Sequence, residues 1–168
     1  MKIDEILEQL LDVLHRETEL YRGMSSVMDK EKNAAIQSEL IALNEAGIEK
    51  ENILAALGFL EDQRRELVTS LADNLNHPAQ DLNLTVISQL VAEPFAGRMK
   101  QVSSDLSALL ETLQVANQRN RQLFEHSLEL LRGSFNLFSE LRPSSPVYHR
   151  TGAIQNTPAS GRCVCDEV

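Results

Sequence analysis

Residues 106–141 read LSALLETLQVANQRNRQLFEHSLELLRGSFNLFSEL, and apolar side chains recur in them at alternating steps of four and three residues. This spacing is typical of a helix that packs lengthwise against other helices. The predicted seam contains Leu106, Leu110, Leu113, Asn117, Asn120, Phe124, Ser127, Leu131, Ser134 and Phe138. The stretch therefore predicts a long helix of a bundle, with polar side chains interrupting its seam.

The second half of this helix carries more apolar side chains than one seam requires. Between residues 123 and 141 they cover about 180° of the helix circumference, whereas a core-facing helix needs a stripe of about 100°. They are Leu123, Phe124, Leu128, Leu130, Leu131, Phe135, Leu137, Phe138 and Leu141. The excess could be buried by other helices of the same chain, or it could form a groove for a partner. The concentration of Phe side chains beside a polar tail favours the partner slightly.

Composition and charge limit the class of protein. The chain has 168 residues, 4% aromatic residues and no Trp, so its core must consist mainly of Leu, Ile, Val and Ala, which suits helices. A net charge of -9, concentrated in residues 1–76, repels nucleic acid and anionic lipid. The acidic, amphipathic first residues do not match a signal peptide, and the apolar runs are too short to span a membrane. We therefore expect a cytoplasmic protein without nucleic-acid partners or membrane insertion.

Two long helical segments precede the third, and no alternating strand pattern of useful length is present. The first covers about residues 2–29, and the second ends at the cluster Asn74–Pro78. We expect the turn between them near Asp29–Asn33, with Asn44–Gly47 as the alternative. The predicted seam of the second helix contains Ile36, Leu40, Leu43, Gly47, Lys50, Leu54, Leu57, Glu61, Arg64, Val68 and Leu71.

A connector over residues 76–94 leads to the third long helix. Thr85 can cap a short helix through about Ala92, and Pro94 starts the third helix, which should end near Leu141. Helices of this length predict an all-α fold, an elongated antiparallel bundle of three long helices with a short connecting helix. Residues 1–142 should form this helical domain, and residues 143–168, rich in small polar residues and Pro, a flexible, disordered tail.

The polar side chains of the third helix favour structure over catalysis. Asn117 and Asn120 have no nucleophile and base beside them in the sequence, and amides in a helical seam commonly fix helix register through buried hydrogen bonds. We therefore interpret both as helix-register residues.

Metal and enzyme chemistry find little support in the sequence. A di-metal carboxylate bundle needs Glu-x-x-His pairs, and no His has Glu three residues before it; the four are His15, His77, His126 and His149. Cys163 and Cys165 supply half of a closed zinc site. No glycine-rich phosphate loop or nucleophile motif is present. We expect no enzymatic activity, metal or cofactor.

Several motifs occur in an order and spacing that resemble a known family. They are Leu14-x-x-Glu17, the run Glu31–Ile36, Lys50-Glu51-x-Ile53-Leu54-x-x-Leu57, Glu61-x-x-Arg64, Asn117-x-x-Asn120-Arg121-x-Leu123, Ser127-Leu128 and Val147-Tyr148-x-x-x-Gly152. Over residues 1–152 the chain is similar to the FlgN family of flagellar type III export chaperones. The resemblance implies a cytoplasmic chaperone that sequesters the terminal helices of hook-associated (hook–filament junction) proteins and delivers them to the export gate.

The resemblance also implies roles for particular side chains. The client would lie on the C-terminal part of the third helix, and Tyr148 in the tail would contact the cytoplasmic domain of the export gate. The expected client-binding residues are Leu123, Phe124, Leu128, Leu131, Phe135 and Phe138. The free chaperone would be a monomer or a weak homodimer. From the residues alone, a structural coiled-coil adaptor that self-associates is the alternative, and a four-helix-bundle enzyme or metal carrier is a more distant one.

Overall fold

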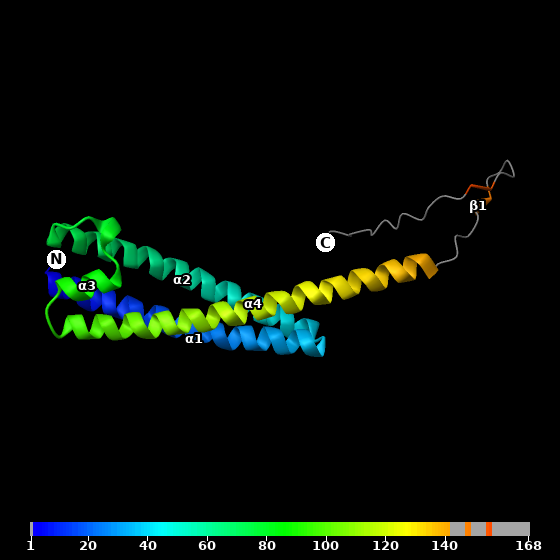
Figure 1. The fold of residues 1–168 in the computed structure, drawn as a ribbon, viewed down its shortest axis with the longest axis horizontal. Coiled ribbons are helices and arrows are strands. Elements are labelled where there is room, and N and C mark those ends of the chain that lie inside the picture. Colours follow the sequence, from blue (N-terminus) through cyan, green and yellow to red (C-terminus); the bar gives the residue numbers. More distant parts are fainter. Residues whose placement is uncertain (1, 142–146, 149–153, 156–168) are drawn as a thin grey trace. The chain divides into compact units, whose positions relative to one another are not determined.

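The computed structural model describes residues 2–141, 147–148 and 154–155. Its helices are α1 (Ile3–Gln37), α2 (Leu40–Leu75), the short 3-10 helix η1 (Ala79–Asp81), α3 (Leu84–Leu90) and α4 (Phe95–Leu141) (Figure 1). The chain divides into two compact units, residues 1–123 and residues 124–168. The prediction of an all-α bundle is confirmed, as are the end of the second long helix and both ends of the third.

A two-residue turn at Ser38 and Glu39 joins α1 to α2. Ser38 adopts the left-handed conformation, with φ at 58°. Its N–H and that of Glu39 donate to the carbonyls of Ala35 and Ala34, a pairing that satisfies the last carbonyls of α1. Both predicted positions of this turn are wrong. The helical pattern continues through 29–33 and 44–47, and the chain reverses at a Ser that offers no strong turn signal.

Ion pairs between the long helices show their directions. Lys30 pairs with Glu49 near the turn and Glu17 with Arg64 further from it, so α1 and α2 are antiparallel. Contacts between α1 and α4 join residues about 90 apart at both ends, at Glu8 with Arg98 and at Met28 with Asn120. Because the separation in sequence is nearly the same at both ends, α4 runs parallel to α1. Figure 1 shows the two helices side by side in residues 1–123.

Two apolar clusters hold residues 1–123 together. The larger lies where α1, α2, α3 and the start of α4 meet, and its buried residues are Ile6, Leu7, Leu10, Leu11, Leu14, Leu71, Ala72, Leu82, Ile87, Met99 and Val102. The smaller joins the three long helices further along and contains Met24, Met28, Leu57 and Leu113. As the composition predicts, the cores are aliphatic and contain no buried aromatic side chain among the described residues.

The observed seams of α2 and α4 agree with the predicted ones at only some positions. At others, the side chain that packs in the bundle is the residue just before the predicted one. In α4, Leu109 and Ala116 pack against the smaller cluster, whereas the predicted Leu110 and Asn117 are exposed. In α2 the same shift places the packed side chain at Ile53 and not at Leu54. Leu57 and Leu71 of the predicted α2 seam and Leu113 and Asn120 of the predicted α4 seam are buried as expected.

Two asparagines in the connector between α2 and α4 cap the neighbouring helices. Asn76, with φ at 49°, ends α2 in the same way that Ser38 ends α1, because its N–H and that of His77 donate to the carbonyls of Asp73 and Ala72. Asn83 caps α3 by accepting a hydrogen bond of 2.9 Å from the N–H of Val86 on its Oδ1. The predicted cap at Thr85 is therefore wrong, since Thr85 lies inside the helix.

Two short strands follow α4. β1 (Val147–Tyr148) pairs antiparallel with β2 (Ile154–Gln155), so that Tyr148 lies opposite Ile154. This pairing was not expected from the sequence. The other residues of the predicted tail, 143–146, 149–153 and 156–168, lie outside the described residues.

Candidate binding surfaces

The last part of α4 presents large apolar side chains to solvent. Phe135 and Phe138 are each 70% exposed, and Leu128 and Leu131 are exposed as well. Leu130 and Leu137 add to this surface. The spacing of 128, 131, 135 and 138 alternates three and four residues, which places these side chains on one face of the helix. We call Leu128, Leu131, Phe135 and Phe138 the α4 face.

Two other residues of the predicted client-binding set lie differently. Leu123 and Phe124 are half-buried, so they are less accessible than the α4 face. Leu123 belongs to the unit of residues 1–123, and Phe124 begins the second unit. The predicted set therefore contains four exposed side chains and two that are partly covered.

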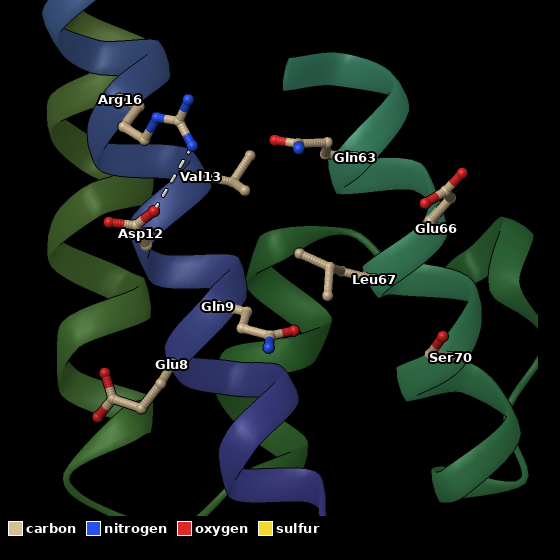
Figure 2. A pocket seen from close by; sticks show the side chains of 9 residues that line it. All are labelled: Glu8, Gln9, Asp12, Val13, Arg16, Gln63, Glu66, Leu67 and Ser70. Carbon is tan, nitrogen blue, oxygen red and sulfur yellow. Dashed lines mark ion pairs between the residues drawn. The ribbon is translucent and has the colours of Figure 1, made fainter. Parts of the chain in front are cut away.

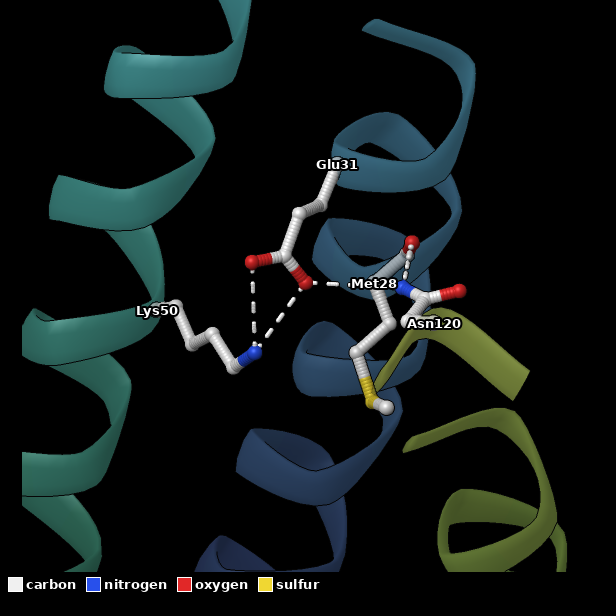
Figure 3. A network of polar contacts seen from close by, with 4 residues as sticks. All are labelled: Met28, Glu31, Lys50 and Asn120. Carbon is white, nitrogen blue, oxygen red and sulfur yellow. Dashed lines mark hydrogen bonds and ion pairs between the residues drawn. The ribbon is translucent and has the colours of Figure 1, made fainter. Parts of the chain in front are cut away.

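A polar network joins the three long helices around Asn120 (Figure 3). The Nδ2 of Asn120 donates to the carbonyl oxygen of Met28 at 2.8 Å and to Oε2 of Glu31 at 3.4 Å. The Nζ of Lys50 donates to the same carboxylate, at 3.0 Å to Oε2 and 3.3 Å to Oε1. Asn120 is buried, and its two hydrogen bonds join α4 to one turn of α1, at Met28 and Glu31. Asn117 differs from the prediction, because its exposed side chain lies outside this seam.

Replacing Asn120 and Asn117 separately tests what each amide contributes. Asn120→Ala removes two hydrogen bonds and leaves a small cavity, so we expect the free energy of unfolding to fall by about 1–2 kcal/mol. Asn117→Ala, a matched change on an exposed position of the same helix, should change it by less than about 0.5 kcal/mol. Urea denaturation followed by circular dichroism measures both. Equal effects would show that the network does not hold α4 in register.

A second buried polar group lies between α1 and α2. Glu17 is buried, and its Oε1 accepts a hydrogen bond of 3.0 Å from Nε of Arg64, which is partly exposed. Burial, and to a lesser extent the nearby Glu17 carboxylate, raises the pKa of the Tyr21 phenol above its ordinary value. Glu17 and Arg64 both belong to motifs noted in the sequence, and their ion pair joins α2 to α1.

An exposed ion pair fixes the beginning of α4 to α1. The guanidinium of Arg98 donates to both carboxylate oxygens of Glu8, at 2.6 and 3.1 Å, and lies 5.9 Å from the centre of the Phe95 ring. The hydrogen bond from Arg98 lowers the pKa of Glu8, and the bond to Glu8 raises that of Arg98. Such an exposed bidentate pair helps to position α4 on α1 but adds little to the free energy of unfolding.

A groove between α1 and α2, which the sequence did not indicate, has a volume of about 610 Å³ (Figure 2). Most of its lining residues are of polar type, although more of the lining surface is apolar; the residues are Glu8, Gln9, Asp12, Val13, Arg16, Gln63, Glu66, Leu67 and Ser70. Asp12 and Arg16 pair with each other at 3.8 Å, and both are exposed. Among the described residues, no group donates a hydrogen bond to the buried Oε1 of Gln63. Exposed, mutually paired charges do not resemble the perturbed groups of an active site.

The histidines of the described residues do not converge on a metal site. Nδ1 of His15 lies 2.9 Å from the carbonyl oxygen of Leu11, and His126 lies 3.9 Å from a carboxylate oxygen of Glu129. Within residues 2–141 and the four strand residues, no three His, Cys, Asp or Glu side chains group as metal ligands would. His149, Cys163 and Cys165 lie outside the described residues. Within the described residues, no helix is both long and apolar enough to cross a membrane.

A bundle of long helices, with exposed apolar faces and polar networks that join one helix to another, is an architecture suited to binding other helices. A family model described as FlgN protein matches residues 1–156, and the chain belongs to the FlgN family. Membership implies a flagellar export chaperone, because FlgN is a family of chaperones and not of enzymes. Searches of curated proteins and of solved structures each found no match.

Proposed function

We propose that this chain is a cytoplasmic export chaperone that sequesters the terminal helices of hook-associated junction proteins on α4 and delivers them to the flagellar export gate. The observation that carries the proposal is the α4 face, where Leu128, Leu131, Phe135 and Phe138 are all exposed. Large aromatic side chains exposed at helical spacing are suited to holding an amphipathic helix by its apolar stripe. Family membership provides the flagellar context.

The proposed mechanism is binding without chemistry. Terminal helices of junction subunits would polymerise early if their apolar stripes were uncovered, and the α4 face would cover them. Release must remain possible, so we expect a modest affinity, in the micromolar to submicromolar range or roughly -8 to -10 kcal/mol. Half-buried Leu123 and Phe124 would extend the contact if the client helix continues toward residues 1–123.

The binding step can be tested directly. Isothermal titration of the full chain with a purified hook-associated protein should give saturable one-to-one binding, and the client's terminal helix as a peptide should compete for it. No binding of either probe at concentrations near 100 times the expected dissociation constant would reject the proposal. The self-associating coiled-coil adaptor predicts a different result, a stable assembly of several copies without client, which light scattering detects.

Delivery is proposed to depend on Tyr148. Its strand β1 lies in the second unit, and an aromatic residue in a short tail element is suited to anchoring a partner. Tyr148→Ala should leave the circular dichroism spectrum, the melting temperature and client affinity unchanged, because the change lies outside the bundle. Binding of the client-loaded chaperone to the cytoplasmic domain of the export gate should weaken by about 1–3 kcal/mol. Isothermal titration with client present measures this, and Val147→Ala serves as the neighbouring control. Equal gate affinities for wild type and Tyr148→Ala would remove the tail anchor.

A further inference from the structure

Helix α2 carries a second apolar surface that its packing in the bundle leaves uncovered. Leu40 and Ile41 are 77% and 79% exposed, and Ile48, Leu54 and Phe59 are also exposed. None of these five belongs to either apolar cluster of the bundle. Large apolar side chains gathered on one surface of an otherwise acidic protein mark an interaction site more often than chance exposure does.

The exposed apolar side chains form a stripe along α2, which the exposed polar residues Asn44 and Glu51 interrupt. Leu40, Gly47 and Leu54 recur every seven residues, and Ile41, Ile48 and Ala55 recur beside them, with Gly58 and Phe59 completing the pattern. We call residues 40, 41, 47, 48, 54, 55, 58 and 59 the α2 stripe. It extends over 20 residues, or about 30 Å at 1.5 Å per residue, and lies apart from the packed side chains Ala46, Ile53 and Leu57 of the same helix. A repeat of seven residues along a helix is the pattern that receives another helix.

The surface of the stripe is hollowed and open to close approach. Two shallow hollows of about 430 and 530 Å³ adjoin at Leu40, the first also lined by Gly47 and Ile48 and the second by Ile41. A Cβ atom added at Gly47 or at Gly58 would meet nothing within 4 Å. The backbone of α2 is therefore accessible at two points of the stripe.

The charges around the stripe select the kind of partner. Residues 39–62 contain Glu39, Glu45, Glu49, Glu51, Glu61 and Asp62, against Lys50 alone. Lys50 is paired with Glu31, and Glu49 with Lys30. Glu39, Glu45 and Glu51, which line the two hollows, form no ion pair within the described part of the chain. A second copy of this chain would bring two acidic surfaces together, whereas a helix with flanking Lys or Arg would complement them.

We propose that the α2 stripe is a docking surface for a basic amphipathic helix of a partner protein, separate from the α4 face. The apolar side chains of the partner helix would pack along the stripe, and its cations would pair with Glu39 and Glu45 at the sides of the stripe and with Glu51 inside it. The proposal gives the chain two helix-binding surfaces that differ in their excess of carboxylates: six acidic residues against Lys50 over residues 39–62, and Glu125, Glu129 and Glu140 against Arg132 near the α4 face.

The probe is a 21-residue helical peptide with Leu at heptad positions and Lys on the flanks, titrated into the full-length chain. Two matched peptides accompany it, one with Glu in place of Lys and one with Ser in place of Leu. We expect the Lys-flanked peptide to bind, with amide NMR shifts concentrated in residues 40–59. The Glu-flanked and Ser-substituted peptides should bind at least about tenfold more weakly.

Variants locate the site. The pair Ile41→Ser with Ile48→Ser should weaken peptide binding at least tenfold, and Glu45→Gln with Glu51→Gln should weaken it severalfold and reduce its salt dependence. The matched pair Leu90→Ser with Val115→Ser, exposed apolar positions outside the stripe, should leave it unchanged. Because all these positions are exposed, circular dichroism should show that every variant remains folded.

Three results would overturn the inference. Shifts confined to residues 124–140, with binding lost in Leu131→Ser and Phe138→Ser, would assign the peptide to the α4 face. Equal binding of the Lys-flanked and Glu-flanked peptides would remove the basic partner. A dimer of the free chain that dissociates on Ile41→Ser with Ile48→Ser would make a second copy the occupant. The proposed chaperone function does not depend on any of these outcomes, since client binding to α4 is measured separately.

Discussion

Replacing Leu131 and Phe138 together by Ser should abolish binding of a hook-associated client while the bundle remains folded. Both side chains are exposed in the free chain, so their removal costs the fold little, less than about 1 kcal/mol. In the complex they would be buried, and truncating two anchors of an interface costs roughly 4 kcal/mol, or about a thousandfold in affinity. Isothermal titration measures the affinity, and thermal denaturation measures the stability.

The matched control is Leu110→Ser with Val115→Ser, two exposed apolar positions earlier on the same helix. Client affinity should not change in this variant. If instead Leu131→Ser with Phe138→Ser lowers the free energy of unfolding by several kcal/mol, as large-to-small changes in a packed core do, these residues belong to a core and the α4 face is not a binding surface.

Leu71→Ala should produce the largest loss of stability, about 2–5 kcal/mol in the free energy of unfolding. Leu71 has no exposed surface and packs in the larger cluster, where α1, α2, α3 and α4 meet, so truncation leaves a cavity that four helices cannot easily close. Chemical denaturation of the purified chain measures the change.

Leu54→Ala is the control on the same helix. Leu54 is 54% exposed and lies on the α2 stripe, so its truncation should cost less than about 1 kcal/mol. The difference between the two variants separates the packed face of α2 from its outward face. Similar losses in both would mean that the stripe is covered in solution even without a partner.

Much of the fold follows from the sequence because long helices leave a strong periodic signal. The end of α2 is marked by Asn76 and Pro78, and α4 begins after Pro94, all residues with strong backbone preferences. The turn between α1 and α2 was placed wrongly because Ser38 adopts a left-handed conformation that Ser rarely favours. The hydrogen bonds made after Gln37, and not the intrinsic preference of Ser, hold it there.

The shift of the seams has a different cause. Apolar residues occur in adjacent pairs at Ile53 and Leu54 and at Leu109 and Leu110, so both neighbours satisfy a seven-residue pattern. Only the directions from which the other helices approach decide which member of each pair is buried. That choice is a tertiary effect, and for this reason the sequence predicts Asn117 in the seam and does not indicate the α2 stripe.

The sequence predicts part of the candidate binding surface. The excess of apolar side chains after Leu123 predicts a surface larger than a seam, and Leu128, Leu131, Phe135 and Phe138 are exposed, while their role in binding stays a prediction. The pairing of Asn120 with Met28 could not be predicted, because it depends on the axial register of α4 against α1, which sequence periodicity does not fix.

The two-residue turn at Ser38 and Glu39 also bears on the order of folding. Moving away from it, contacts between α1 and α2 span 19 residues at Lys30 and Glu49 and 47 residues at Glu17 and Arg64. Each contact shortens the loop that the next must close, so this hairpin can zip from its turn. The hydrogen bonds of α4 with α1 instead span about 90 residues, from Arg98 with Glu8 to Asn120 with Met28. The first contact of α4 must therefore close a much longer loop than the first contact of the hairpin, and we expect α4 to dock after the hairpin has formed.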